Sequence, residues 1–271
     1  ELQLQISEIS PVPPESIDRA DFLPVCPKNI EDLMVRLREL ASTVRKASLQ
    51  RLARQILNDH QLMDRFKTAP AAKSMHHAYL GGLIEHTVSV AEMVSSIASF
   101  YPDLNRDLLL LGAILHDIGK VDEFAYDLSI DYSHAGRLLG HMVLGFQILD
   151  EKVRSLKSFP SEDALLLGHL ILSHHGEVDL GAVRLPMTRE AFVLHFADDL
   201  DAKMNSLTRI ITEGKQGDEA WTPYQPLFER FFFRGFPASA EGRTSSRIES
   251  IKECGVQLKL WSTGRSPEES V

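Results

Sequence analysis

Histidine is concentrated in one part of this chain. Of the eleven histidines in 271 residues, all except His60 lie between His76 and His195. A neutral imidazole is the commonest protein ligand for a metal ion, and carboxylates join it around hard or borderline cations. Histidines and aspartates gathered in one segment therefore favour a centre for divalent cations.

The most informative pair is His116-Asp117, which directly follows the apolar run Leu108–Leu115. Because this run is apolar nearly all round, it predicts a buried central helix, with Asn105 as its N-cap. An isolated buried carboxylate is costly, so Asp117 at the end of such a helix needs a positive partner. A metal ion would supply that charge. The alternative is a helix-end ion pair, which is weak evidence for stability.

Further candidate ligands stand at expected helix ends or on apolar helix faces, namely His86, His141, His174, His175 and Asp198. Each has a simpler explanation when taken singly. A lone buried histidine is more often a hydrogen-bonded core residue, and two histidines at a helix C-terminus can be cations favoured by the helix dipole. Asp198 competes with Asp199 and Asp201 on one acidic stretch. Taken jointly, over several helices, these residues predict one shared cation site.

Helical periodicity dominates from Ile30 onward and predicts the elements that carry these residues. We expect helices over about 30–44, 49–56, 83–97, 108–115, 138–158, 162–173 and 188–212. No convincing run of strands lies among them, so the predicted fold class is all-α. Upstream, the alternation from Leu2 to Ile9 predicts a short strand, and the prolines within residues 10–28 predict a linker.

Composition limits the classes of function. No apolar run approaches the roughly 18 residues of a membrane span, and two distant cysteines predict a reducing, cytoplasmic location without disulfides. With 38 acidic and 29 basic residues, the net charge of −9 does not favour a protein that coats nucleic acid. Residues 28–73 nevertheless hold ten basic and five acidic side chains. This local surplus indicates either a track for a nucleic-acid backbone or the solvated side of amphipathic helices.

The order of His86, His116-Asp117 and Asp198 resembles the metal-binding pattern of the HD-domain phosphohydrolases, an all-α superfamily. Longer stretches resemble one branch more closely, the YhaM-type 3′→5′ exoribonucleases. These stretches are residues 76–87, 115–120, 139–141, 172–176 and 200–204, within a resemblance that covers about 21–212. The resemblance implies an HD-type helical bundle at 29–220. Residues 1–28 would be the last strand and linker of a mostly absent OB-fold, and 221–271 an extension of unknown role.

The resemblance also implies residue roles. One divalent ion would be held by His86, His116, Asp117 and Asp198, and a second by His141, His174, His175 and the bridging Asp117. Asp117 and Lys120 would be catalytic, with a surface lysine that caps the helix end as the alternative for Lys120. His76, His77, Tyr79 and Lys203 would contact substrate, with a core-facing side chain as the alternative for Tyr79. Manganese is the implied ion, in one or two copies per chain, and these ligand types would also accept iron, cobalt, zinc or magnesium.

The implied activity is 3′→5′ exoribonuclease action on single-stranded RNA, in which a metal-activated water releases nucleoside monophosphates. Two alternatives stay open. One is an HD-type hydrolase of a nucleotide or cyclic dinucleotide, which would use the same ions. The other is a non-catalytic module that binds nucleotides or nucleic acid. We also expect a homo-oligomer with no membrane association.

Overall fold

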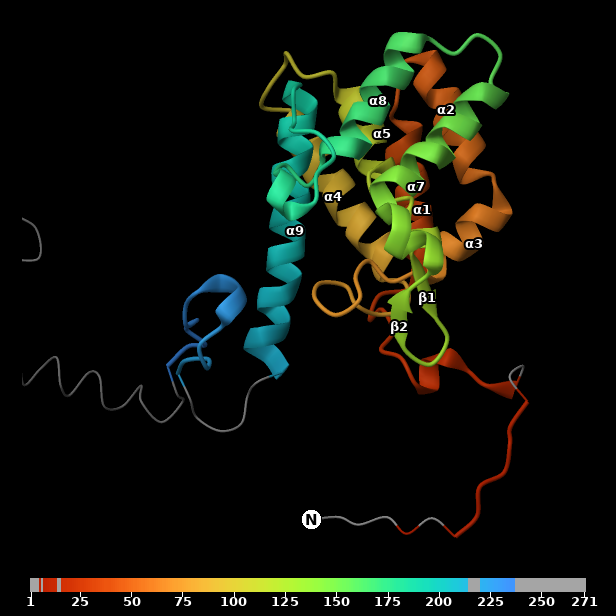
Figure 1. Cartoon of the computed structure of the whole chain (residues 1–271). Helices are drawn as coiled ribbons and strands as arrows, with labels where there is room; N and C mark the ends of the chain where they lie inside the picture. The colour runs from red at the N-terminus through yellow and green to blue at the C-terminus, as the bar shows by residue number, and fades with distance from the viewer. Residues whose placement is uncertain (1–4, 6, 14–15, 214–219, 237–271) are drawn as a thin grey trace, which may run out of the picture. The chain divides into compact units, whose positions relative to one another are not determined.

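The computed structural model describes residues 5, 7–13, 16–213 and 220–236. Its internal contacts divide the chain into two compact units, Glu1–Leu207 and Thr208–Val271. The helices are α1 (Ile30–Ser42), α2 (Ala47–Leu57), α3 (His60–Thr68), α4 (Gly82–Ala98), α5 (Arg106–Leu115), α6 (Lys120–Glu123), α7 (His134–Ser155), α8 (Ser161–Ser173) and α9 (Arg189–Glu213) (Figure 1). The predicted all-α class is confirmed, with one small hairpin added.

Helix α5 is the centre of the first unit and packs against α1, α2, α4 and α8. Every residue from Leu108 to Leu115 is buried, as expected for a run that is apolar on all sides. The side chain of Asn105 accepts a hydrogen bond from the backbone N–H of Leu108 at 3.1 Å, which confirms the predicted cap. The helix ends at Leu115, and His116–Gly119 form the turn into α6.

Some elements were not anticipated from periodicity. Strands β1 (Phe124–Tyr126) and β2 (Ile130–Tyr132) form an antiparallel hairpin in which Phe124 pairs with Tyr132. Three-residue strands are too short to show an alternating pattern, and the same holds for the short helices α3 and α6. Helix α7 begins four residues before the predicted start at 138 and bends at Gly140, where φ is 71° and ψ is 159°. Only glycine adopts this conformation readily.

The structure describes part of the N-terminal strand and linker that the sequence predicts. Of the predicted strand Leu2–Ile9, residues 5 and 7–9 are described and belong to no strand, while the rest lies outside the described residues. The described part of the linker contains a 3₁₀ turn at Arg19–Asp21 and a bridge between Val25 and Leu80. Among the described residues, no helix has the length and apolar character that crossing a membrane requires.

Candidate metal centre

The candidate ligands come from five helices and converge inside the first unit. His86 lies on α4, His116 and Asp117 follow α5, His141 lies on α7, His174 and His175 follow α8, and Asp198 lies on α9. His86, His116, Asp117, His141 and His174 are buried, and the side chain of Asp198 is only 15% exposed. The arrangement brings together all the candidate ligands that the sequence suggested.

Site 1 comprises His86, His116, Asp117 and Asp198. The Nε2 atom of His86 lies 3.2 Å from Nε2 of His116 and 3.1 Å from Oδ1 of Asp198. Asp117 Oδ2 lies 3.5 Å from Nε2 of His86 and 3.3 Å from Nε2 of His116. Donor atoms at such separations can share one cation with bonds of about 2.0–2.2 Å.

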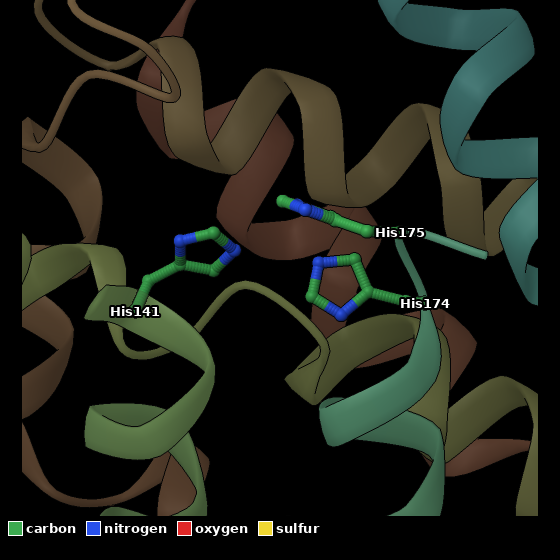
Figure 2. A group of neighbouring side chains, drawn as sticks. All are labelled: His141, His174 and His175. Carbon is green, nitrogen blue, oxygen red and sulfur yellow. The ribbon is translucent and has the colours of Figure 1, made fainter. Parts of the chain in front are cut away.

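Site 2 comprises His141, His174, His175 and Asp117. The three imidazoles turn toward one another from α7 and from the segment after α8 (Figure 2). One ring nitrogen from each of them lies within 4.8 Å of the others. Asp117 Oδ1 lies 3.4 Å from Nε2 of His141 and 3.5 Å from Nε2 of His174. Asp117 therefore faces site 1 with one oxygen and site 2 with the other.

Several buried polar atoms of this cluster lack a hydrogen-bond partner. They include both carboxylate oxygens of Asp117 and the Nε2 atoms of His141 and His174. Lys120 Nζ lies 2.6 Å from Asp117 Oδ2 as an ion pair, but its geometry is not that of a hydrogen bond. Buried polar groups are normally satisfied, so orphaned acceptors that point at one another need an explanation. Divalent cations between them provide it, and the donor set fits.

Four of the histidines are held by the nitrogen that points away from the cluster. The Nδ1 atoms lie within hydrogen-bond distance of Asp201 Oδ2 for His86 (2.7 Å), the Ala113 carbonyl for His116 (2.8 Å), Glu123 Oε1 for His141 (3.1 Å) and the Ile171 carbonyl for His174 (2.8 Å). These acceptors require hydrogen on Nδ1, so Nε2 is the nitrogen that faces inward and can bind a metal. Metal-binding histidines in proteins are oriented in this way.

The protonation of the cluster follows from burial and charge. Burial opposes the charge of Asp117, but Lys120 and the neighbouring imidazoles outweigh it and hold the pKa of that carboxyl well below its usual value. Burial lowers the pKa of His174 to about 3, so this imidazole is neutral at pH 7. Burial also acts on His86, but Asp198 and Asp201 dominate and raise its pKa to about 9. A metal at site 1 must displace that proton.

A cavity of about 160 Å³ opens beside the cluster and is lined by His76, Lys120, His175, His195 and Asp198, among others. His76 Nδ1 is buried without a hydrogen-bond partner, and burial lowers the pKa of this imidazole to about 3. A larger groove of about 830 Å³ near the end of α4 and the start of α9 has a mainly apolar lining. None of the candidate ligands lines that groove, so the small cavity is the one connected with the chemistry.

The other expected substrate contacts lie elsewhere. His77 and Tyr79 stand behind His86, where His77 Nε2 is 2.9 Å from Asp201 Oδ2 and Nδ1 is 2.9 Å from the Tyr79 hydroxyl. Lys203 is exposed and pairs with Asp199 at 2.7 Å. Of the competing aspartates, only Asp198 faces site 1.

Three residues near the cluster were not assigned a role from sequence: Glu123, His195 and Asp201. Glu123 follows no recognisable pattern, and it reaches His141 because α6, which ends at Glu123, packs against α7. His195 lines the cavity, and its Nδ1 lies 2.9 Å from the carbonyl of His174. Of these three residues, the sequence singles out only Asp201, which lies about one helical turn after Asp198 and is therefore an alternative ligand.

The basic residues of 28–73 are largely engaged within the protein. Seven of the ten make ion pairs or hydrogen bonds: Lys28 with Glu85, Arg36 with Glu39 and Glu92, Arg38 with Leu57 and Asn58, Lys46 with Asp163, Arg65 with Asp122, Lys67 with Glu31, and Lys73 with Asp131. A track that binds a nucleic-acid backbone needs cations that can neutralise phosphates. Because these basic side chains already have partners within the protein, they are better interpreted as the solvated side of amphipathic helices than as a track for nucleic acid.

An all-α unit that buries two histidine groups on either side of one carboxylate has the features of a metal-dependent helical enzyme. Residues 83–203 match the family model of the HD domain, and this segment contains all the candidate ligands. This segment is an HD domain, which supports metal-dependent phosphohydrolase activity in general. No solved structure matches the chain.

Proposed function

We propose that this protein is a divalent-metal-dependent phosphodiester hydrolase, with 3′→5′ exoribonuclease activity as its specific reaction. The observation that carries the proposal is Asp117, whose two oxygens lack a hydrogen-bond partner and face separate histidine groups. Site 1 and site 2 would each hold one ion, with Asp117 bridging them and manganese as the expected metal. Ions bound there would activate water and neutralise charge on the phosphoryl group.

The protein's own residues would bind and orient the substrate. Lys120 lines the cavity and lies against Asp117, so its ammonium group can fix that carboxylate and attract a phosphate oxygen. His76 has an unpaired nitrogen at the same cavity and is placed to contact the phosphate or ribose. Lys203 is further out and would contact the strand only after leaving Asp199.

The size of the cavity bears on the substrate. At about 160 Å³ it is smaller than the roughly 300–1,000 Å³ of sites that enclose a small molecule. A phosphodiester at the end of a strand needs only its terminal group to enter. This supports exonucleolytic action over enclosure of a whole nucleotide.

A second candidate is hydrolysis of a nucleotide or cyclic dinucleotide by the same ions. It is favoured by the engaged basic residues of 28–73, which leave few cations for a long RNA backbone. A non-catalytic binding module is the third candidate function, and the complete sets of candidate ligands at site 1 and site 2 argue against it.

Incubation with manganese and a 5′-labelled single-stranded RNA separates these functions. We expect a ladder of labelled products that shortens from the 3′ end, and release of nucleoside monophosphates. Asp117→Asn keeps the shape of the side chain but removes the bridging charge, so it should abolish the ladder while the helical CD spectrum is retained. Turnover of nucleotides alone would establish the second candidate, and saturable RNA binding without turnover would establish the third. Normal activity of Asp117→Asn would refute the bridging role.

A further inference from the structure

A set of polar side chains lies on the far side of His86 from site 1. Asp201 Oδ2 lies 2.7 Å from Nδ1 of His86 and 2.9 Å from Nε2 of His77. A carboxylate only accepts hydrogen bonds, so both of these ring nitrogens carry hydrogen. Asp201 therefore fixes the tautomer of His86 that presents the Nε2 lone pair to the metal.

His77, His86 and Asp201 could in principle bind a third ion, since their ligand atoms lie within 4.8 Å of one another. The distances argue against this. Separations of 2.7 and 2.9 Å are those of direct hydrogen bonds to a carboxylate. In addition, His86 would have to bind one ion through each nitrogen. These three residues are a hydrogen-bonded support.

The support continues outward to the segment that precedes α1. The Tyr79 hydroxyl lies 2.9 Å from Nδ1 of His77 and donates to Glu85 Oε2 at 2.6 Å. The other Glu85 oxygen pairs with Lys28 Nζ at 3.1 Å, and Cys26 Sγ donates to Oε2 at 3.2 Å. The backbone is joined at the same place, because Leu80 N–H donates to the Pro24 carbonyl and Cys26 N–H to the Leu80 carbonyl.

The backbone conformation of His77 is a second observation that points to a positioning role for this residue. Its φ of 46° lies in the left-handed region, which is costly for a residue with a side chain. Its N–H donates to Asn205 Oδ1 at 2.9 Å, and its carbonyl accepts from Ala71 N–H at 3.1 Å. Such conformations persist where surrounding contacts fix them, and they cluster at functional sites.

We propose that Asp201 and His77 are positioning residues for His86, and that Tyr79 and Glu85 connect them to residues 24–28. The affinity of site 1 for its ion then depends on a segment that lies ahead of the HD-domain match. This inference rests on the metal centre of the proposed function and adds to it residues that touch neither ion nor substrate.

The test is titration of the full chain with cobalt(II) alone, followed by its visible absorption. Asp201→Ala should weaken one cobalt-binding step by about 10–100-fold, the usual effect of losing an outer partner of a metal-binding histidine. Asp201→Asn, which keeps one acceptor oxygen, should recover part of this loss. The melting temperature of the metal-free protein serves as the readout of a purely structural role.

The cobalt titrations distinguish the positioning role of Asp201 from the existence of the metal centre itself. Unchanged cobalt affinity in Asp201→Ala, or equal weakening of both steps together with a lower melting temperature, would overturn the inference. Failure of the unaltered protein to bind cobalt would overturn the metal centre itself, and the inference with it.

The outer connection needs a separate variant. Tyr79→Phe removes the hydroxyl between His77 and Glu85 and should weaken the same cobalt step, by less than Asp201→Ala does. Tyr101→Phe removes a hydroxyl from a tyrosine that is 60% exposed and should change nothing. If the two tyrosine variants bind cobalt alike, residues 24–28 are not connected to site 1.

Discussion

The charges buried around Asp117 come close to balance before any ion enters. Asp117, Asp198 and Asp201 are negative, Lys120 is positive, and His86 holds a proton because its pKa is raised to about 9. One negative charge is left over, and a divalent ion that replaces the proton at site 1 adds the one positive charge that balances it. Proton and metal therefore compete for the same nitrogen, Nε2 of His86.

This competition predicts that metal affinity depends on pH. The raised pKa of His86 stabilises the metal-free fold fully below about 6.5, and this contribution is lost as pH rises through about 9. Metal affinity changes in the opposite direction and should increase about tenfold per pH unit between pH 6 and 8, for one displaced proton. Cobalt titration at three pH values measures the slope, and calorimetry in two buffers counts the released protons. A flat affinity across this range would contradict the assignment of the proton to His86.

Residue types and order were enough to suggest the ligands, but their supports were not visible in the sequence. His116-Asp117 after an apolar run is a local signal, and His174-His175 before a glycine is another. Glu123 and Asp201 act through partners 18 and 115 residues away, His141 and His86. No local pattern encodes such pairs, because they depend on how the helices pack.

At the scale of elements, the centre depends on how closely the turn after α5 approaches α7. Gly119 has an ordinary φ of −67°, so backbone freedom does not explain a glycine there. A Cβ atom at this position would overlap with the carbonyl oxygen of His141 and the amide nitrogen of Gly145. The missing side chain lets the turn that carries His116 and Asp117 lie directly against α7.

Gly119→Ala should therefore destabilise the protein and disturb site 2. The added methyl meets backbone that cannot rotate away, and overpacking of this kind costs about 1–3 kcal/mol. Urea unfolding measures the loss, and cobalt titration shows whether His141 has moved from Asp117. Gly168→Ala is the matched control, since its methyl meets the end of the half-exposed Phe146 ring, which can move. Equal stability of both variants would contradict the close-packing explanation.

The hydrophobic periodicity of the sequence predicts the long helices but not the bends and short elements between them. The apolar stripes of α1 and α4, and the residues that flank α8, placed these helices within a few residues. The bend in α7 was missed because Gly140 lies within an otherwise helical pattern, and a single glycine does not distinguish a tolerated residue from a break. The bend matters because it frees the N–H of His141, which donates to Glu123 Oε1 at 3.0 Å.

At the scale of the whole molecule, the candidate ligands join distant parts of the first unit. They span residues 86–198 and come from α4, α5, α7, α8 and α9 or the segments that follow them. Each of these elements has its own apolar packing, but the centre is where their polar side chains meet. An ion bound there would link helices that are otherwise held together mainly by hydrophobic contacts.

Metal binding should consequently stabilise this unit as a whole. An ion at about 100 times its dissociation constant adds about 2.7 kcal/mol, which for a unit of this size raises the melting temperature by roughly 5–10 °C. Calorimetric scans with and without manganese measure the shift, and it should grow with the logarithm of the metal concentration. Asp117→Asn should lose the shift, whereas Asp150→Asn, which breaks an exposed pair with Arg154, should keep it. If cobalt binds but saturating metal leaves the transition in place, the ion does not bridge these helices, and the shared centre proposed around Asp117 is wrong.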